Sequence, residues 1–170
     1  MYNSRKFFIT VFAICIGLLI FGLYLEHVQG LEACPLCIFQ RIAYTAIIFI
    51  ALIGAIHNPR NLLQNIYKLL MVISAITGAA IAGRQIWLQH LPPELVPECG
   101  PGLDYMFNVF PFGEALKMIF TGSGECAEVK WRFIGLSIAE WSLIMFIGIF
   151  IATILSIYTS RYKNTNQPKN

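Results

Sequence analysis

The sequence predicts an all-α integral membrane protein, built as a four-transmembrane-helix bundle with two outward-facing loops. Of the 170 residues, 57% are hydrophobic and only 12% are charged, whereas about 25% of the residues of a typical soluble domain are charged. Four continuous apolar stretches approach or exceed the roughly 20 residues that cross a bilayer as a helix. These stretches lie near Phe7–Leu25, Ile38–Ile56, Ile66–Leu88 and Phe133–Tyr158. The whole chain, residues 1–170, is therefore predicted to be one membrane domain.

The first apolar stretch is interpreted as a retained helix rather than a cleaved signal peptide. It begins after Arg5 and Lys6, as a signal peptide would. However, its apolar run is longer than the usual 7–15 residues, and no clear small-residue cleavage site follows it.

The charge pattern predicts the orientation of the four spans. Basic residues without acidic neighbours occupy the N-terminus, the connection after the second span and the C-terminal tail 159–170. The acidic residues fall in or beside the other two loops, apart from Glu140 in the fourth span. By the positive-inside rule both termini are expected to be cytoplasmic. Residues 26–37 and about 89–132 would then face outward, which in bacteria is the periplasm.

The chain has five cysteines, and four of them are predicted to lie on the outward face. Cys15 falls within the first span and is interpreted as a small buried hydrophobe. Cys34, Cys37, Cys99 and Cys126 fall in the two outward loops, on the side of the oxidising periplasm. Four cysteines allow three pairings, and the simplest joins Cys34 to Cys37 and Cys99 to Cys126. A zinc site is the competing interpretation, although it would usually show a second close pair.

The first pair has the features of a redox-active dithiol. A C-x-x-C bridge closes a very small loop, so it stabilises little and is more often reactive than structural. Cys37 lies at the start of the second span, where free backbone N–H groups and the helix dipole favour its thiolate form. Arg41 follows on the same helix face, one turn further. It could stabilise that thiolate or the oxygen of an acceptor gaining electrons, or it could simply extend its charge to the interface.

The sequence also restricts where the electrons of this dithiol go. It contains no haem-attachment C-x-x-C-H, no iron–sulfur cysteine run and no dinucleotide-binding motif. By elimination, a lipid-soluble quinone is the expected acceptor at that depth. The net charge of +3 is small and scattered along the sequence, so no nucleic-acid partner is expected. The expected partners are a thiol substrate, the quinone and the lipid bilayer.

Three features together resemble a known family. They are the four spans, the segment C-P-L-C-I-F-Q-R that opens the second span, and the segment G-E-C-A-E-x-x-W at residues 124–131. With the single cysteine at position 99, they make nearly the whole chain similar to the DsbB family of disulfide-forming membrane proteins. That family belongs to the route that passes electrons from DsbA to quinone and keeps the periplasm oxidising.

The resemblance implies a thiol:quinone oxidoreductase of the bacterial inner membrane that reoxidises a periplasmic DsbA-like protein. Cys34 and Cys37 match the pair that reduces quinone, either ubiquinone or menaquinone, and Arg41 matches the quinone-site arginine. Cys99 would form the mixed disulfide with the partner. Cys126 would then attack the first pair at Cys34, and Cys37 would remain as the electron donor.

Two further expectations concern the second loop and the residues before it. The family has polar residues near the quinone at this point, so Gln89 and His90 are the candidates here, with Arg84 also possible. The aromatic segment Leu103–Phe120, broken by proline and glycine, is expected to lie on the membrane as a short amphipathic element.

Three rival interpretations stay open. One is a specialised relative that serves a single dedicated partner. Another is an enzyme like vitamin K epoxide reductase, although the G-E-C-A-E-x-x-W segment favours DsbB. The third is a non-catalytic membrane scaffold whose two disulfides are structural.

Overall fold

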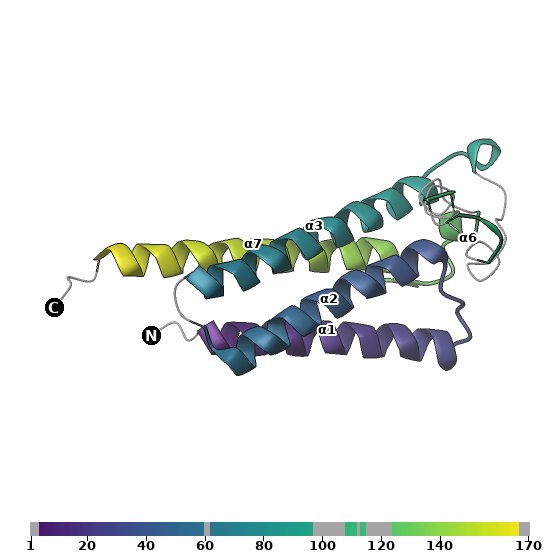
Figure 1. Ribbon diagram of the computed structural model, residues 1–170. Helices are drawn as coiled ribbons and strands as arrows, with labels where there is room; N and C mark the ends of the chain where they lie inside the picture. Colours follow the sequence, from purple (N-terminus) through teal and green to yellow (C-terminus); the bar gives the residue numbers. More distant parts are fainter. Residues whose placement is uncertain (1–3, 60–61, 97–107, 112, 115–123, 167–170) are drawn as a thin grey trace.

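Four long helices run along the molecule and form a bundle, with the shorter elements gathered at one end (Figure 1). The computed structural model describes residues 4–59, 62–96, 108–111, 113–114 and 124–166. The long helices are α1 (Ser4–His27), α2 (Pro35–His57), α3 (Leu62–Gln89) and α7 (Ile138–Asn166). Each contains a stretch long and apolar enough to cross a membrane. The predicted four-helix membrane fold is confirmed.

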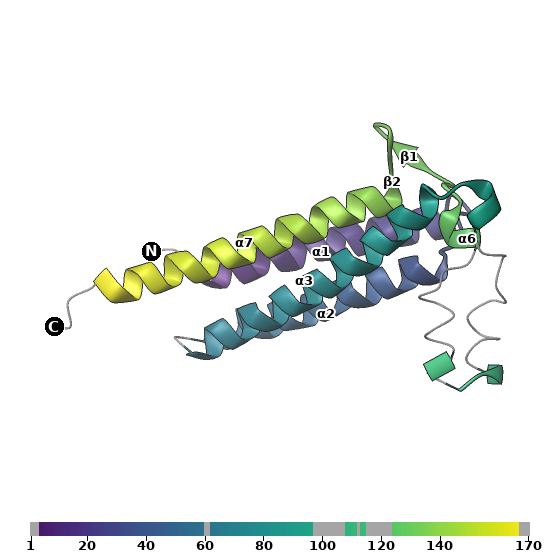
Figure 2. The same cartoon turned by 90° about the horizontal axis from the view of Figure 1, so that it is seen from above.

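The helices pack in chain order, α1 against α2, α2 against α3 and α3 against α7 (Figures 1 and 2). Close packing of α3 on α7 depends on Gly78, because a β-carbon there would lie 2.3 Å from the ring of Phe146. The same ring stacks on Tyr44 of α2, with 4.1 Å between the ring centroids. Phe146 therefore joins three helices in the middle of the core.

The fourth span was predicted to begin at Phe133, but α7 begins at Ile138, and a small hairpin precedes it. Strands β1 (Arg132–Phe133) and β2 (Leu136–Ser137) pair antiparallel. The two residues between them, Ile134 and Gly135, have positive φ angles of 52° and 81°. Two consecutive positive φ angles are typical of a tight hairpin turn. Because of this turn, the first residues of the apolar run are not helical, and α7 begins after the hairpin.

A capping box fixes the start of α7. The carboxylate of Glu140 accepts a hydrogen bond from the backbone N–H of Ser137 at 2.6 Å, and the Ser137 hydroxyl accepts from the N–H of Glu140 at 3.3 Å. Serine followed three residues later by glutamate is the sequence pattern of this cap. Glu140, the acidic residue expected in the fourth span, therefore lies in the first turn of α7 as a capping residue.

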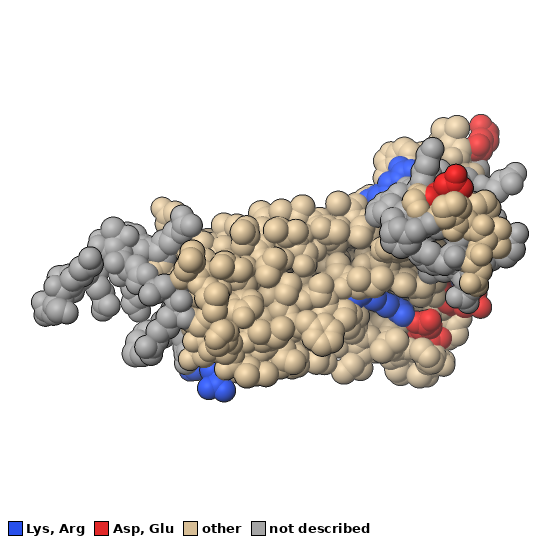
Figure 3. Space-filling model, in the orientation of Figure 1, with Lys and Arg blue, Asp and Glu red and all other residues tan. Residues whose placement is uncertain are grey.

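The short elements surround the ends of α2 and α3. They are the 3-10 turn η1 (Pro93–Leu95) and the four-residue helix α6 (Gly124–Ala127). In Figure 3 the described acidic side chains lie towards the end of the molecule that carries these elements, and the middle of the bundle surface is largely uncharged. This distribution suits a bundle whose central part is surrounded by lipid.

Candidate functional site

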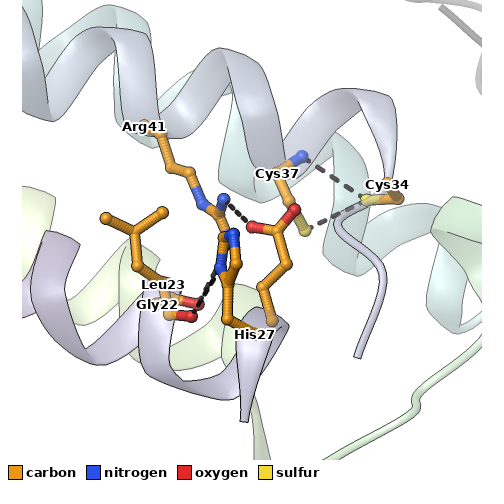
Figure 4. Close-up of polar contacts among 7 residues, drawn as sticks. Gly22, Leu23, His27, Cys34, Cys37 and Arg41 are labelled. Atoms are coloured by element: carbon orange, nitrogen blue, oxygen red, sulfur yellow. Dashed lines mark hydrogen bonds and ion pairs between the residues drawn. The ribbon is translucent and has the colours of Figure 1, made fainter. Parts of the chain in front are cut away.

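The C-P-L-C segment forms the start of α2. Cys34 is the N-cap residue and Pro35 is the first helical residue, where a proline loses no helical hydrogen bond. The sulfur of Cys34 accepts a hydrogen bond from the backbone N–H of Cys37 at 3.4 Å. The segment thus turns into the helix with both sulfurs on the same side, and the two Sγ atoms are 3.0 Å apart (Figure 4).

Cys126 of α6 joins the two sulfurs from the second loop. Cys34 is 7% exposed and Cys126 is fully buried, and both belong to one apolar cluster with Leu36, Ile81 and Leu88. The hydrogen bond of Cys34 to Cys126, then its bond to Cys37 and its burial, raise the pKa of Cys34 above the ordinary thiol value of 9.0. Three of the four predicted outward cysteines therefore meet at one point.

A pair of buried glutamines lies against the dithiol, and neither was among the predicted site residues. Gln85 of α3 and Gln40 of α2 are 4% and 3% exposed. The side-chain nitrogen of Gln85 lies 3.2 Å from the Cys37 sulfur and 3.4 Å from the Cys34 sulfur. Its oxygen accepts a hydrogen bond from the Gln40 side chain at 2.7 Å and lies 3.5 Å from the Cys37 sulfur.

Arg41 extends from α2 towards the end of α1, as Figure 4 shows. Its guanidinium forms an ion pair with the carboxylate of Glu26 and donates to the carbonyl of Gly22 at 3.2 Å. The side chains of Arg41 and Glu26 are 25% and 32% exposed. The arginine lies beside the dithiol, but its hydrogen bonds join it to α1 rather than to Cys37.

A pocket of about 530 Å³ opens beside these residues, between α1, α2, α3 and α7, with residues of the loop before β1 at one end. Its wall is mainly apolar. The polar side chains that line it include Cys34, Cys37, Gln40, Arg41, Tyr44, Gln85 and Gln89. The apolar ones include Leu18, Leu25, Leu31, Trp131, Trp141 and Met145. Pockets of this size, with an apolar wall and a few polar groups, are typical of small-molecule sites.

The other predicted polar residues lie at different distances from the pocket. Gln89 lines it, and the Gln89 side-chain oxygen accepts from the Ser137 hydroxyl at 2.9 Å. His90 is exposed, and its ring nitrogen lies 2.8 Å from the carbonyl of Ile86. Arg84 lies over the Trp87 ring, 4.1 Å from its centroid. Of these three predicted candidates, Gln89 is the one among the pocket-lining residues.

Two predictions fall partly or wholly outside the described residues. Cys99 lies outside them, so the pairing of Cys99 with Cys126 stays a prediction. Most of the predicted amphipathic segment Leu103–Phe120 also lies outside them. Within its described part, Phe110 packs against the cluster that contains Cys34 and Cys126.

The chemistry that this arrangement can perform is thiol–disulfide exchange followed by electron transfer to a small molecule. Cys34 contacts both of the other sulfurs, so it can form a bridge with either one. Cys37 faces the pocket, and Arg41 supplies a permanent positive charge on the same wall. A planar apolar molecule with polar oxygens would fit such a wall.

Comparisons with known proteins agree with these observations. The sequence model of the family "Disulfide bond formation protein DsbB" matches residues 4–156. A disulfide bond formation protein B from Azoarcus sp. (strain BH72) is 50% identical over 144 residues, which cover 85% of this chain and 86% of that protein. The protein of the same name from Aromatoleum aromaticum is 44% identical over 160 residues, covering 94% and 96%. The one from Acinetobacter baumannii is 45% identical over 139 residues, covering 81% of each.

Proposed function

The chain belongs to the DsbB family of disulfide bond formation proteins, and we propose that it is a membrane thiol:quinone oxidoreductase. It would reoxidise a periplasmic DsbA-like dithiol protein and pass the two electrons through its cysteine pairs to membrane quinone. One observation carries the quinone half of this proposal. The Cys34–Cys37 dithiol and Arg41 share a wall of a largely apolar pocket of about 530 Å³.

The residues of the pocket fit a quinone head group. Apolar side chains from α1 and α7 would cover the faces of its ring, and the guanidinium of Arg41 would donate to a ring oxygen. Gln89 also lines the pocket, and its side-chain amide is a further polar group there. We therefore propose Arg41 and Gln89 as quinone-binding residues, whereas His90, just after α3, is exposed and is not among the pocket residues. When bound, the quinone accepts two electrons and two protons.

The contact between Cys126 and Cys34 supports the proposed route between the two cysteine pairs. In that route the Cys126 thiolate attacks the Cys34 sulfur of an oxidised Cys34–Cys37 bridge. A Cys126–Cys34 bond forms, the Cys34–Cys37 bond breaks, and the electron pair leaves on Cys37. Cys37 then faces the pocket as a thiolate, ready to deliver electrons.

The entry of electrons is assigned to Cys99. Pro97 and Pro101 flank it in the sequence, and proline favours an extended segment that a partner groove can bind. We propose that Cys99 forms the mixed disulfide with the DsbA-like partner. Cys126 is thereby released as the thiolate that attacks Cys34.

The proposed location is the bacterial inner membrane, with both termini in the cytoplasm. The four apolar helices support a multi-pass membrane protein. The cysteine end of the bundle carries the described acidic side chains (Figure 3). In the sequence, the basic residues without acidic neighbours fall in the N-terminal segment, the connection after the second span and the C-terminal tail, which the positive-inside rule associates with the cytoplasm.

The test is quinone reduction by the purified protein, followed by absorbance, with a reduced DsbA-like protein as the electron donor and ubiquinone and menaquinone analogues as acceptors. We expect turnover that is lost when Cys34 and Cys37 are both replaced by serine. A structural scaffold would show no turnover with either quinone and would keep its bridges under mild reduction. A zinc protein would copurify with the metal. Either result would overturn the proposal.

A further inference from the structure

Gln85 is the polar group in closest contact with both sulfurs of the dithiol, although it lies on a different helix. Its side-chain nitrogen is 3.2 Å from the Cys37 sulfur and 3.4 Å from the Cys34 sulfur. Gln85 is 4% exposed. Burying an amide costs free energy unless it is hydrogen-bonded. The contacts of this amide with the sulfurs and with Gln40 therefore compensate for its burial.

Gln40 contacts the oxygen end of the Gln85 amide. The nitrogen of Gln40 donates to the oxygen of Gln85 at 2.7 Å, the shortest of the contacts in this group. A primary amide has two N–H donors on its nitrogen and acceptors on its oxygen alone. The nitrogen then lies against both sulfurs, and the oxygen, 3.5 Å from the Cys37 sulfur, accepts from that thiol only while it is protonated. Gln40 is itself 3% exposed, so water competes little for this bond.

We propose that Gln85 is a fixed hydrogen-bond donor to the sulfurs of Cys34 and Cys37, and that Gln40 is the positioning residue that holds its amide in this orientation. This proposal rests on the thiol chemistry proposed above for the same site. It assigns to an amide on α3 the stabilisation of negative charge that the sequence spacing had suggested for Arg41.

The role follows from the charge that moves during exchange. When Cys126 attacks Cys34, the Cys34–Cys37 bond breaks and its electron pair leaves on the Cys37 sulfur, while the Cys126–Cys34 bond forms. No proton is required in that step. The leaving sulfur becomes negative next to the N–H donors of Gln85, and a hydrogen bond to a charged group is worth more than one to a neutral group. Because Gln85 is already in place, little reorganisation is needed when the charge develops.

The first experiment isolates Cys37 in the full-length protein. A chain with Cys15→Ala, Cys34→Ser, Cys99→Ser and Cys126→Ser keeps a single thiol, whose reaction with iodoacetamide is followed from pH 5 to 10 by mass spectrometry. Thiolate is the reacting form, so the pH profile reports how well the site stabilises it. Gln85→Leu is expected to slow alkylation at pH 7 by about ten-fold and to move the profile towards alkaline pH.

Two further variants test the orientation of the amide. Gln85→Glu replaces the donor nitrogen with an oxygen acceptor and is expected to slow alkylation at pH 7 at least as much as Gln85→Leu. Gln40→Leu releases the amide and is expected to move the pH profile in the same direction by a smaller amount. Gln64→Leu, which changes a glutamine near the other end of α3, is the matched control and is expected to keep the profile of the parent.

The readout separates a chemical role from a packing role. A change in access to Cys37 would alter the plateau rate at high pH and leave the midpoint of the profile in place. Parent-like midpoints in Gln85→Leu and Gln40→Leu would overturn the proposal. If Gln85→Leu does not fold, Gln85→Met, which keeps the length of the side chain, gives the same comparison. The assay contains neither quinone nor partner protein, so its result is independent of whether quinone is reduced.

Discussion

The guanidinium of Arg41 on α2 forms an ion pair with the carboxylate of Glu26 on α1, beside the pocket that holds the dithiol. A second hydrogen bond from the same guanidinium reaches the Gly22 carbonyl. Arg41 therefore joins two helices and lines the pocket at once. Its positive charge is balanced within the protein, and this explains how an arginine is tolerated so close to the membrane interior.

Replacing Arg41 tests whether it also serves the electron acceptor. Arg41→Ala removes the permanent donor on the pocket wall and is expected to raise the KM for quinone by about ten-fold, since hydrogen bonds from charged groups are among the stronger ones. Exchange with the partner through Cys34, Cys37, Cys99 and Cys126 should be unaffected. The measurement is quinone reduction over a range of quinone concentrations.

The control for this variant is Glu26→Gln, which keeps an oxygen acceptor for Arg41 and removes only the carboxylate charge. It is expected to raise the KM less than Arg41→Ala does. Should Arg41→Ala show the quinone dependence of the parent, Arg41 would be limited to joining α1 and α2.

Cys37→Ser is expected to abolish quinone reduction and to leave capture of the partner intact. Cys37 lines the pocket and is proposed to receive the electron pair, whereas the mixed disulfide is assigned to Cys99. The measurement combines quinone absorbance with non-reducing electrophoresis of the trapped mixed disulfide. Cys15→Ala, which changes a fully buried cysteine in the core of the bundle, serves as the control. Normal turnover in Cys37→Ser would remove Cys37 from the route.

The raised pKa of Cys34 predicts a dependence on pH and on Cys126. In the reduced protein the pKa of Cys34 lies above the ordinary thiol value of 9.0, and the hydrogen bond to Cys126 is the largest cause of this shift. Cys126→Ala should therefore increase the rate of Cys34 alkylation at pH 9. Mass spectrometry of the modified peptide measures this rate, and an unchanged rate in Cys126→Ala would contradict the contact.

The same shift has a consequence for stability with a definite sign. As the pH rises through about 9, the unfolded chain would release the Cys34 proton while the folded chain still holds it. The free energy of unfolding of the reduced protein is thus expected to fall with pH above this point. Cys34→Ser should weaken that slope. Chemical unfolding in detergent at pH 7 and pH 10 measures the change in the free energy of unfolding. An equal change in the parent and in Cys34→Ser would contradict the raised pKa of Cys34.

Gly78→Ala tests the packing of α3 on α7. A β-carbon at this position would lie 2.3 Å from the Phe146 ring, so the ring or the helices must move. We expect a loss of about 1–3 kcal/mol, typical of overpacking a core, and a lower Tm. Gly83→Ala is the matched control, because a β-carbon there meets no atom within 4 Å. Equal Tm values in the two variants would mean that the helices do not pack as described.

The sequence was sufficient for the elements whose signals are local. Length and hydropathy predicted the four spans, because a helix in lipid must bury an apolar surface over its whole length. The fourth span was predicted to begin at Phe133 because Phe133 and Ile134 are apolar. In the structure both residues belong to the hairpin, and α7 begins five residues later. The serine and glutamate of the capping box, Ser137 and Glu140, were the local signal that could have placed this boundary.

What the sequence determined by itself was that Cys34 and Cys37 lie at the start of a helix with Arg41 one turn further, since these positions are fixed by local geometry. What only the tertiary structure decided was which groups surround them. Gln85 is 48 positions from Cys37, and Glu26 is 15 positions from Arg41. Separations of this kind are closed by the packing of α1, α2 and α3, which buries amides and pairs charges wherever the helix faces meet. No spacing rule within one helix contains that information.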